Sequence, residues 1–334
     1  MSAANFIKDT MNGLKEAQHI TVAFVVIVVI SLALRIWVRT RMIKQFGWDD
    51  WTMVLACVLY VTHSGVGYTI CEMGIKSLTN PKIAAQLVPY TRASAALYSF
   101  VMIFLKISVA LFFYKIFSHR PVQRIVIWIV AILTILSGLA YFGVGAFTCA
   151  SAKTYKAITG KCKAQIPHEI IFAVFSCINI AGDIAFAGMA VVALMKAKLP
   201  AITKFTASLL ILFGFFGGIA TIIRLYWTLK PVTGLTYYSV SVNLGRWVAI
   251  ELGASLAATN FGTIRPLFHM ILEKLRLIST VRETTYGTAG NVSGRHGTQR
   301  GTQNRPGTGL EADEIALVTN IKREVTVDVD EEKA

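Results

Sequence analysis

Long apolar blocks separated by short polar segments recur along the 334-residue chain. A helix needs about 20 residues to cross the hydrocarbon layer of a membrane, and most blocks are at least this long. The blocks span residues 17–34, 51–71, 93–114, 125–152, 170–195, 205–229 and 237–264. Strands of a membrane β-barrel would be about 10 residues long with alternating polarity, which the blocks do not show. The pattern therefore predicts an all-α fold, a bundle of seven transmembrane helices.

The composition agrees with a protein that lies in a lipid bilayer. Hydrophobic residues make up 54% of the chain and charged residues 15%, whereas a soluble globular domain has about 25% charged residues. The formal net charge is +15, but the basic residues fall mainly between the blocks. They do not interleave with aromatic residues as on a nucleic-acid-binding surface. We therefore expect the lipid bilayer, and no nucleic acid, as a partner.

The blocks and the basic residues also predict domain limits and an orientation. Residues 1–16 form a short segment outside the membrane and residues 17–272 the seven-helix domain. Residues 273–334 form a cytoplasmic, largely disordered tail, because apolar residues become sparse there. The segments that this arrangement places in the cytoplasm are denser in lysine and arginine, in line with the positive-inside rule. We expect a multi-pass protein of the plasma membrane or an endomembrane, with its N-terminus outside.

Polar and charged side chains interrupt the apolar blocks at a few positions. They are His63, Lys106, Asn179, Asp183, Arg224 and Glu251. A charged side chain at the bilayer centre costs about 2.5–3.5 kcal/mol on insertion scales, so such residues face the bundle interior and pair there. We expect Lys106 to pair with Asp183, and Arg224 with Glu251. The exchanged pair of Lys106 with Glu251 fits nearly as well, and the residues could serve either as structural contacts or as a polar, ligand-binding core.

Two adjacent carboxylates, Asp49 and Asp50, stand at the entry to the second block. An acidic side chain in the first turn of a helix can cap free backbone N–H groups and complement the helix dipole. We assign both residues to helix capping, together with an ion pair to Arg39 or Arg41. Because no further carboxylate or histidine lies nearby in the sequence, we expect no metal site.

Cysteine positions and absent motifs narrow the chemistry further. Cys149 and Cys162 fall in the same predicted outer segment, and Cys71 lies at the same face. Disulfides persist outside the cell, so Cys149 could bridge to Cys162 or to Cys71. The chain has no P-loop, G-x-S-x-G or HExxH motif, which leaves catalytic residues unassigned. The last block has no lysine to carry a retinal Schiff base, so we expect no cofactor.

Several of these motifs together resemble the fungal rhodopsin-domain family of seven-helix membrane proteins. The similar segments are 35–39 (RIWVR), 46–51 (FGWDDW), 106–117 (KISVALFFYKIF), 179–183 (NIAGD) and 264–267 (IRPL). Arg224, Glu251 and the pair Cys149 and Cys162 also match the pattern, which covers roughly residues 20–270. The resemblance implies a membrane protein that does not bind retinal. Some members are described as candidate G-protein-coupled receptors, and others lie in gene clusters for secondary metabolism.

Three functions fit this sequence. The first is a receptor-like protein that binds a small or lipophilic ligand between its helices and contacts a G protein or another cytoplasmic partner. The second is a membrane-embedded enzyme or accessory protein of a fungal secondary-metabolite pathway, for example a cyclase or isomerase. In that enzyme Asp183 or Glu251 would act as the general acid and Lys106 would tune its pKa. The third is a transporter, for which the chain shows no inverted repeat.

Overall fold

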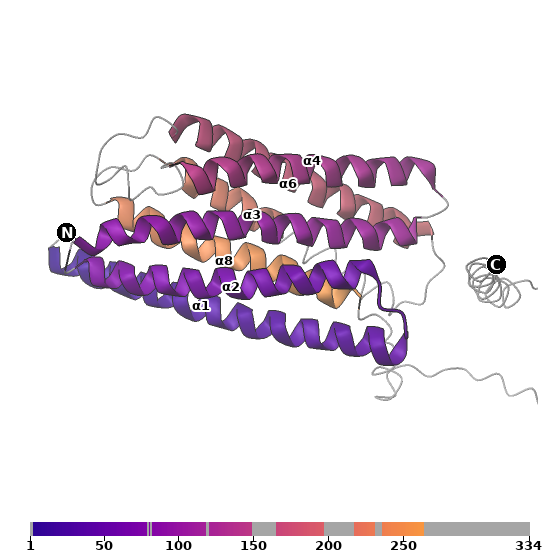
Figure 1. Ribbon diagram of the computed structural model, residues 1–334, viewed down its shortest axis with the longest axis horizontal. Coiled ribbons are helices and arrows are strands. Elements are labelled where there is room, and N and C mark those ends of the chain that lie inside the picture. The colour runs from indigo at the N-terminus through magenta and orange to yellow at the C-terminus, as the bar shows by residue number, and fades with distance from the viewer. Residues whose placement is uncertain are drawn as a thin grey trace, which may run out of the picture. The chain divides into compact units, whose positions relative to one another are not determined.

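The computed structural model describes residues 3–78, 80, 82–117, 120–148, 165–196, 217–230 and 236–263. These residues form helices and short connections, which confirms the all-α prediction. The helices are α1 (Ala3–Trp37), the π-helical segment η1 (Val38–Met42), α2 (Trp48–Ser77), α3 (Lys82–Ile116), α4 (Pro121–Phe147), α6 (Gln165–Lys196) and α8 (Thr236–Gly262) (Figure 1). Residues 217–229 are also helical. Each of the seven predicted blocks therefore contains a helix.

Five helical stretches are long and apolar enough to cross a membrane. They are Asn5–Met42, Trp48–Ser77, Ala85–Lys115, Pro121–Phe147 and Ile166–Val192. α8 has 27 residues, which span about 40 Å at roughly 1.5 Å per residue. Its length therefore suffices for a crossing, although Arg246 and Glu251 make it more polar than the other five. In lipid a helix satisfies its own backbone hydrogen bonds, which explains why apolar blocks of this length fold as helices.

The N-terminal helix begins earlier than the sequence predicts. Residues 3–16 form the first turns of α1, and the position of residues 1–16 outside the membrane stays a prediction. The charged residues there end the apolar block, but the helix continues because it packs against α8. Leu14 is buried, the Arg246 guanidinium of α8 pairs with Glu16, and it donates a 3.2 Å hydrogen bond to the Gly13 carbonyl oxygen. The predicted tail, residues 273–334, lies outside the described residues.

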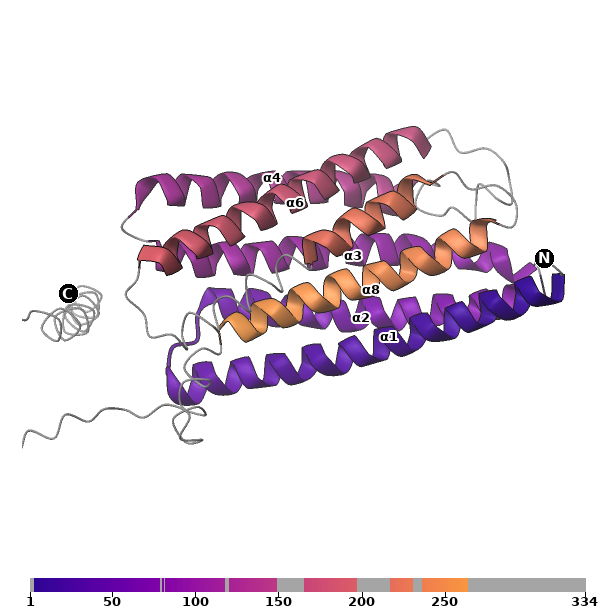
Figure 2. The ribbon, with the colours of Figure 1, turned by 180° about the vertical axis from the view of Figure 1, so that it is seen from behind.

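The described helices pack side by side with an apolar core between them. α1 packs against α2 and α8, α3 packs against α2 and α4, and α4 packs against α6. Figure 2 shows α8 running along α1. The core includes Val28, Met53, Tyr60, Met102 and Phe175. Large apolar side chains also cover the outer faces of α1 and α4, where a lipid environment stabilises them.

α1 and α8 approach each other closely at Gly253. A β-carbon at this position would lie 2.7 Å from the β-carbon of Phe24, which cannot move without shifting α1. We expect Gly253→Ala to lower the free energy of unfolding by about 1–3 kcal/mol through overpacking. Reversible unfolding in mixed detergent micelles, followed by circular dichroism, measures this change.

A glycine in open space provides the control. A β-carbon at Gly188 of α6 meets no atom within 4 Å. Gly188→Ala is therefore expected to stabilise the helix by up to about 1 kcal/mol, because alanine has the higher helix propensity. Equal effects of the two substitutions would contradict the close packing of α1 on α8.

Candidate functional site

A cavity of about 240 Å³ lies between the helices at one end of the bundle. It is bounded by the N-terminal parts of α1, α3, α6 and α8 and by the C-terminal parts of α2, α4 and residues 217–229. The apolar lining includes Leu14, Ile70, Leu87, Phe172 and Val248, and the polar lining includes His63, Ser94, Tyr98, His168 and Arg224. The cavity thus combines apolar walls with a few hydrogen-bonding groups, the usual composition of a site for a small organic molecule.

Arg224 is the cationic group of this lining, and its counterion is Glu251. Arg224 Nε lies 2.6 Å from Glu251 Oε2, and both side chains are at most 2% exposed. The guanidinium lies over two aromatic rings, with Cζ 4.4 Å from the Tyr98 ring centre and 4.5 Å from the Phe172 ring centre. Cation–π contacts of this kind are strongest where water is excluded. The two rings and the carboxylate therefore hold the guanidinium in one orientation at the cavity wall.

Further hydrogen bonds stabilise this buried pair. Glu251 Oε1 accepts a 2.7 Å hydrogen bond from the Thr221 hydroxyl and a 3.2 Å hydrogen bond from the Tyr98 hydroxyl. Arg224 donates a 3.3 Å hydrogen bond to Ser176 Oγ. A buried ion pair offsets its desolvation better when further hydrogen bonds reach it, and here Glu251 Oε1 and a terminal nitrogen of Arg224 have such bonds.

His63 faces the same cavity from α2. It is buried, and its Nε2 atom lies 3.1 Å from Ser94 Oγ of α3. The histidine and the serine therefore form a polar contact between two helices at the cavity wall.

Lys106 and Asp183 form a second ion pair, away from the cavity lining. Lys106 Nζ lies 2.5 Å from Asp183 Oδ1 and donates a 3.3 Å hydrogen bond to the Asn179 carbonyl oxygen. The Lys106 side chain is 4% exposed and that of Asp183 is 32% exposed. The structure thus pairs Lys106 with Asp183, and Glu251 with Arg224. The polar core expected from the sequence divides into a cavity group (His63, Arg224 and its counterion Glu251) and a separate α3–α6 contact.

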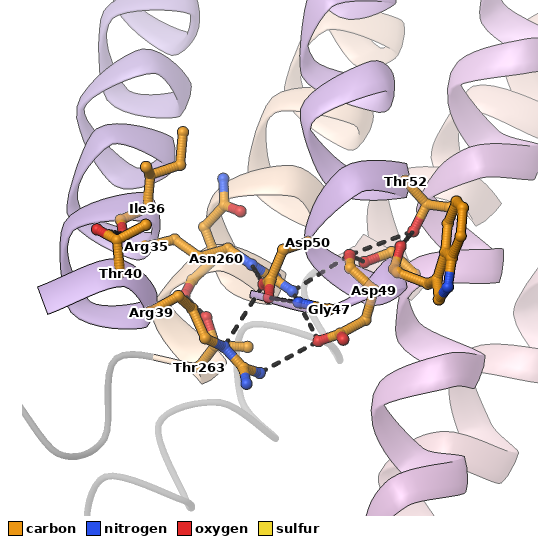
Figure 3. A network of polar contacts seen from close by, with 12 residues as sticks. Arg35, Ile36, Arg39, Thr40, Gly47, Asp49, Asp50, Thr52, Asn260 and Thr263 are labelled. Atoms are coloured by element: carbon orange, nitrogen blue, oxygen red, sulfur yellow. Dashed lines mark hydrogen bonds and ion pairs between the residues drawn. The ribbon is translucent and has the colours of Figure 1, made fainter. Parts of the chain in front are cut away.

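A third set of charges lies at the opposite end of the bundle, and we call it the ionic cluster: Arg35, Arg39, Asp49, Asp50 and Lys115. Arg35 Nε lies 2.8 Å from Asp50 Oδ1, and an Arg39 terminal nitrogen lies 3.2 Å from Asp49 Oδ2 (Figure 3). Lys115 Nζ lies 2.5 Å from Asp49 Oδ1. The cluster therefore joins α1 and η1 to α2 and α3.

Asp50 also caps α2. Its Oδ2 atom accepts a 3.0 Å hydrogen bond from the backbone N–H of Gly47, the residue before the helix. This geometry is the reach-back contact of a capping box. Asp49 instead interacts with the three cations, and its carbonyl oxygen accepts a 2.6 Å hydrogen bond from Ser108 Oγ. Of the two partners suggested by the sequence, Arg39 contacts the aspartates and Arg41 is exposed.

The sequence profile of the fungal rhodopsin domain matches residues 34–270. The chain belongs to this family. The match covers both intramembrane ion pairs and the ionic cluster, and it confirms the family suggested by the sequence motifs. Together with the long apolar helices, it identifies a multi-pass membrane protein in contact with the lipid bilayer. No curated protein and no solved structure matches the chain.

In this fungal rhodopsin domain, two residues of the ionic cluster were not predicted from the sequence to pair with the aspartates. They are Arg35 and Lys115. Arg35 lies four residues before Arg39, so both share one helix face, whereas Arg41 lies on another face. This spacing is a local signal that could have identified Arg35. Lys115 lies 66 positions from Asp49, and no local pattern connects the two.

Of the three cysteines considered for a disulfide, two lie outside the described residues and one lies within them. Cys149 and Cys162, the expected disulfide pair, lie outside the described residues, so the bridge stays a prediction. Cys71, the alternative partner, is a free thiol that lines the cavity. Within the described ranges, no three histidine, cysteine or acidic side chains form a group that could hold a metal ion.

Proposed function

We propose that this fungal rhodopsin-domain protein is a receptor-like membrane protein that binds a small or lipophilic ligand in the cavity. The observation that carries the proposal is the 240 Å³ cavity with Arg224 fixed in its wall. This volume is just below the range of about 300–1,000 Å³ for drug-sized ligands, which favours a small molecule. Its apolar walls would bind the body of the ligand. Arg224, Tyr98 and His63 would orient a polar group.

The proposed orientation places the cavity on the outer side of the membrane. An outside N-terminus puts the N-terminal end of α1, which lines the cavity, at the outer face. The ionic cluster then lies at the cytoplasmic face, where basic residues accumulate. A ligand would enter from outside or from the outer leaflet, and a cytoplasmic partner such as a G protein would contact the other end.

α8 provides a physical connection between these two ends. It supplies cavity residues such as Val248 and the counterion Glu251. Near its C-terminus, Asn260 donates a 3.1 Å hydrogen bond to Ser31 of α1, one helical turn before Arg35. A ligand that displaces the Arg224–Glu251 pair would therefore bias the position of α8 at the far end. Such a displacement would provide the second conformation that receptor signalling requires.

The alternative is a membrane enzyme or accessory protein of a biosynthetic pathway. The observation that favours it is Tyr98, which lines the cavity while its hydroxyl donates a hydrogen bond to Glu251. A proton could pass along this bond between a bound molecule and the carboxylate. Conversion of a bound compound to product, lost in Tyr98→Phe, would support the enzyme. Reversible retention without conversion would support the receptor.

The reactivity of Cys71 tests whether the cavity binds a ligand. We expect 2-naphthol, a compact aromatic alcohol, to slow modification of Cys71 by 2-aminoethyl methanethiosulfonate several-fold, because both would occupy the cavity. Gly67 precedes Cys71 by one turn and lines the same cavity, and its β-carbon would meet no atom within 4 Å. Gly67→Phe should fill the space and abolish protection by 2-naphthol. Peptide mass spectrometry measures the rate at Cys71 alone.

The matched control is Gly65→Phe. A β-carbon at Gly65 also meets no atom within 4 Å, but this residue lies on an exposed face of α2. We expect Gly65→Phe to retain the protection of the unmodified protein. If 2-naphthol protects Cys71 equally in both variants, or in neither variant nor the parent protein, the cavity is not the binding site.

A further inference from the structure

The two ends of the described bundle differ in their exposed charges. At the end formed by η1, the start of α2, the end of α3 and the start of α4, the exposed ionic groups are Arg41, Lys44, Lys115 and Arg120. We call it the basic end. The carboxylates of the described residues there, Asp49 and Asp50, are at most 1% exposed and are paired within the ionic cluster. At the opposite end Asp9, Glu16 and Glu72 are exposed. An uncompensated positive surface therefore exists at one end of the described bundle.

The ionic cluster itself adds to this positive charge. Its three cations face two carboxylates, which leaves one positive charge in excess. Lys115 carries part of this excess to the surface, because its side chain is 54% exposed while it contacts Asp49. A β-carbon at Gly47 would collide with Lys115 Nζ, so the ammonium group lies against the turn that connects η1 to α2. Lys115 and the exposed Lys44 therefore belong to one surface.

Exposed aromatic rings place this surface at the depth of the lipid headgroups. Trp48 is 79% exposed and Trp51 is 61% exposed at the start of α2. The Phe46 ring packs edge-to-face against Trp51, with ring centres 5.5 Å apart. Tryptophan side chains concentrate at the interface between the acyl chains and water. At that depth the cations on the adjoining turn would lie beside the headgroups.

Lys44 lies on the turn between η1 and α2. Lys44 has a φ of 52°, in the left-handed region that favours glycine or asparagine. This conformation turns the chain between η1 and α2 and places Lys44 on the connecting turn. Its ammonium group is exposed on the basic end.

We propose that the basic end binds the headgroup of an anionic phospholipid. Arg41, Lys44 and Lys115 bind its negative charges, while Trp48 and Trp51 pack beside the glycerol and the upper acyl chains. The bilayer always supplies this partner, and anionic lipids are attracted by basic residues next to a membrane span. The proposal concerns a surface remote from the cavity and does not depend on ligand binding there.

Native mass spectrometry of the purified full-length protein tests the proposal with two probes, phosphatidylserine and phosphatidylcholine of the same acyl chains. We expect the protein to retain phosphatidylserine with at least severalfold higher affinity. Arg41→Gln/Lys44→Gln should weaken phosphatidylserine binding roughly tenfold, since each basic residue near the headgroups contributes to the attraction. Binding of phosphatidylcholine should not change.

The control removes the same charge from the opposite end. Lys8 and Lys15 are exposed on the first turns of α1, and Lys8→Gln/Lys15→Gln should leave phosphatidylserine binding unchanged. Raising the ammonium acetate concentration to 0.5 M should weaken binding of phosphatidylserine to the unmodified protein and leave phosphatidylcholine unaffected. Equal affinity for the two lipids, equal loss in both double variants, or insensitivity to salt would overturn the proposal.

Discussion

Glu251→Leu is expected to lower the free energy of unfolding by about 3–5 kcal/mol, because it leaves a buried charge without its counterion. Arg224 would keep its place between Tyr98 and Phe172, but no carboxylate would balance its charge. Titration with sodium dodecyl sulfate in dodecylmaltoside micelles, followed by circular dichroism, measures the change. This substitution affects the cavity wall and the bundle core together.

A double variant that also replaces Arg224 tests the direct interaction between Arg224 and Glu251 more sharply. Arg224→Met/Glu251→Leu removes both charges, and an apolar pair of similar volume can replace a buried ion pair at little cost. We therefore expect the double variant to be more stable than Glu251→Leu alone. The exposed pair of Glu72 and Lys76, 2.8 Å apart, is the matched control, and Glu72→Gln should change stability by less than about 1 kcal/mol. Additive losses in the double variant would contradict a direct Arg224–Glu251 interaction.

The second large effect is expected at the ionic cluster. Asp50→Ala removes the 2.8 Å contact to the buried Arg35 and the hydrogen bond to the Gly47 N–H. We expect a loss of about 3–5 kcal/mol because the three cations of the cluster would then face the single carboxylate of Asp49, with about 1 kcal/mol more from the lost helix cap. The same micelle titration measures the free energy of unfolding.

Asp50→Asn separates the two contributions. The amide oxygen of asparagine can still accept the hydrogen bond from Gly47, but it carries no charge to balance Arg35. Its stability should therefore lie about 1 kcal/mol above that of Asp50→Ala and well below that of the parent protein. Asp9→Ala, at an exposed carboxylate of α1, should have little effect. If Asp50→Ala unfolds like the parent protein, the cluster does not hold α1 to α2.

The sequence predicts the helices well because the thickness of the bilayer sets the length of their apolar blocks. It predicts the beginning of α1 poorly, since charged residues such as Glu16 end the apolar block while the helix continues through its contact with Arg246. Tertiary contacts of this kind are not visible in a local pattern. The same applies to Lys115, which reaches Asp49 from a distant helix.

The sequence predicts which residues form the candidate site, but it does not predict how they are arranged. Hydropathy gives the depth of Lys106, Asp183, Arg224 and Glu251 along their helices, and therefore suggests which charges could meet. It does not give the direction in which each helix faces. Only the packed bundle separates the Arg224 side of the interior, with its cavity, from the Lys106–Asp183 contact between α3 and α6. The cavity itself arises from seven helical segments and has no counterpart in any single motif.

The central claim is that the ionic groups of the spans face one another inside a bundle of membrane-crossing helices. A cryo-electron-microscopy map of the protein in lipid nanodiscs tests this claim most directly. The account predicts seven crossings, with the Arg224 guanidinium between the rings of Tyr98 and Phe172 and in contact with Glu251. A different number of crossings, or a Glu251 carboxylate that faces lipid acyl chains, would contradict it.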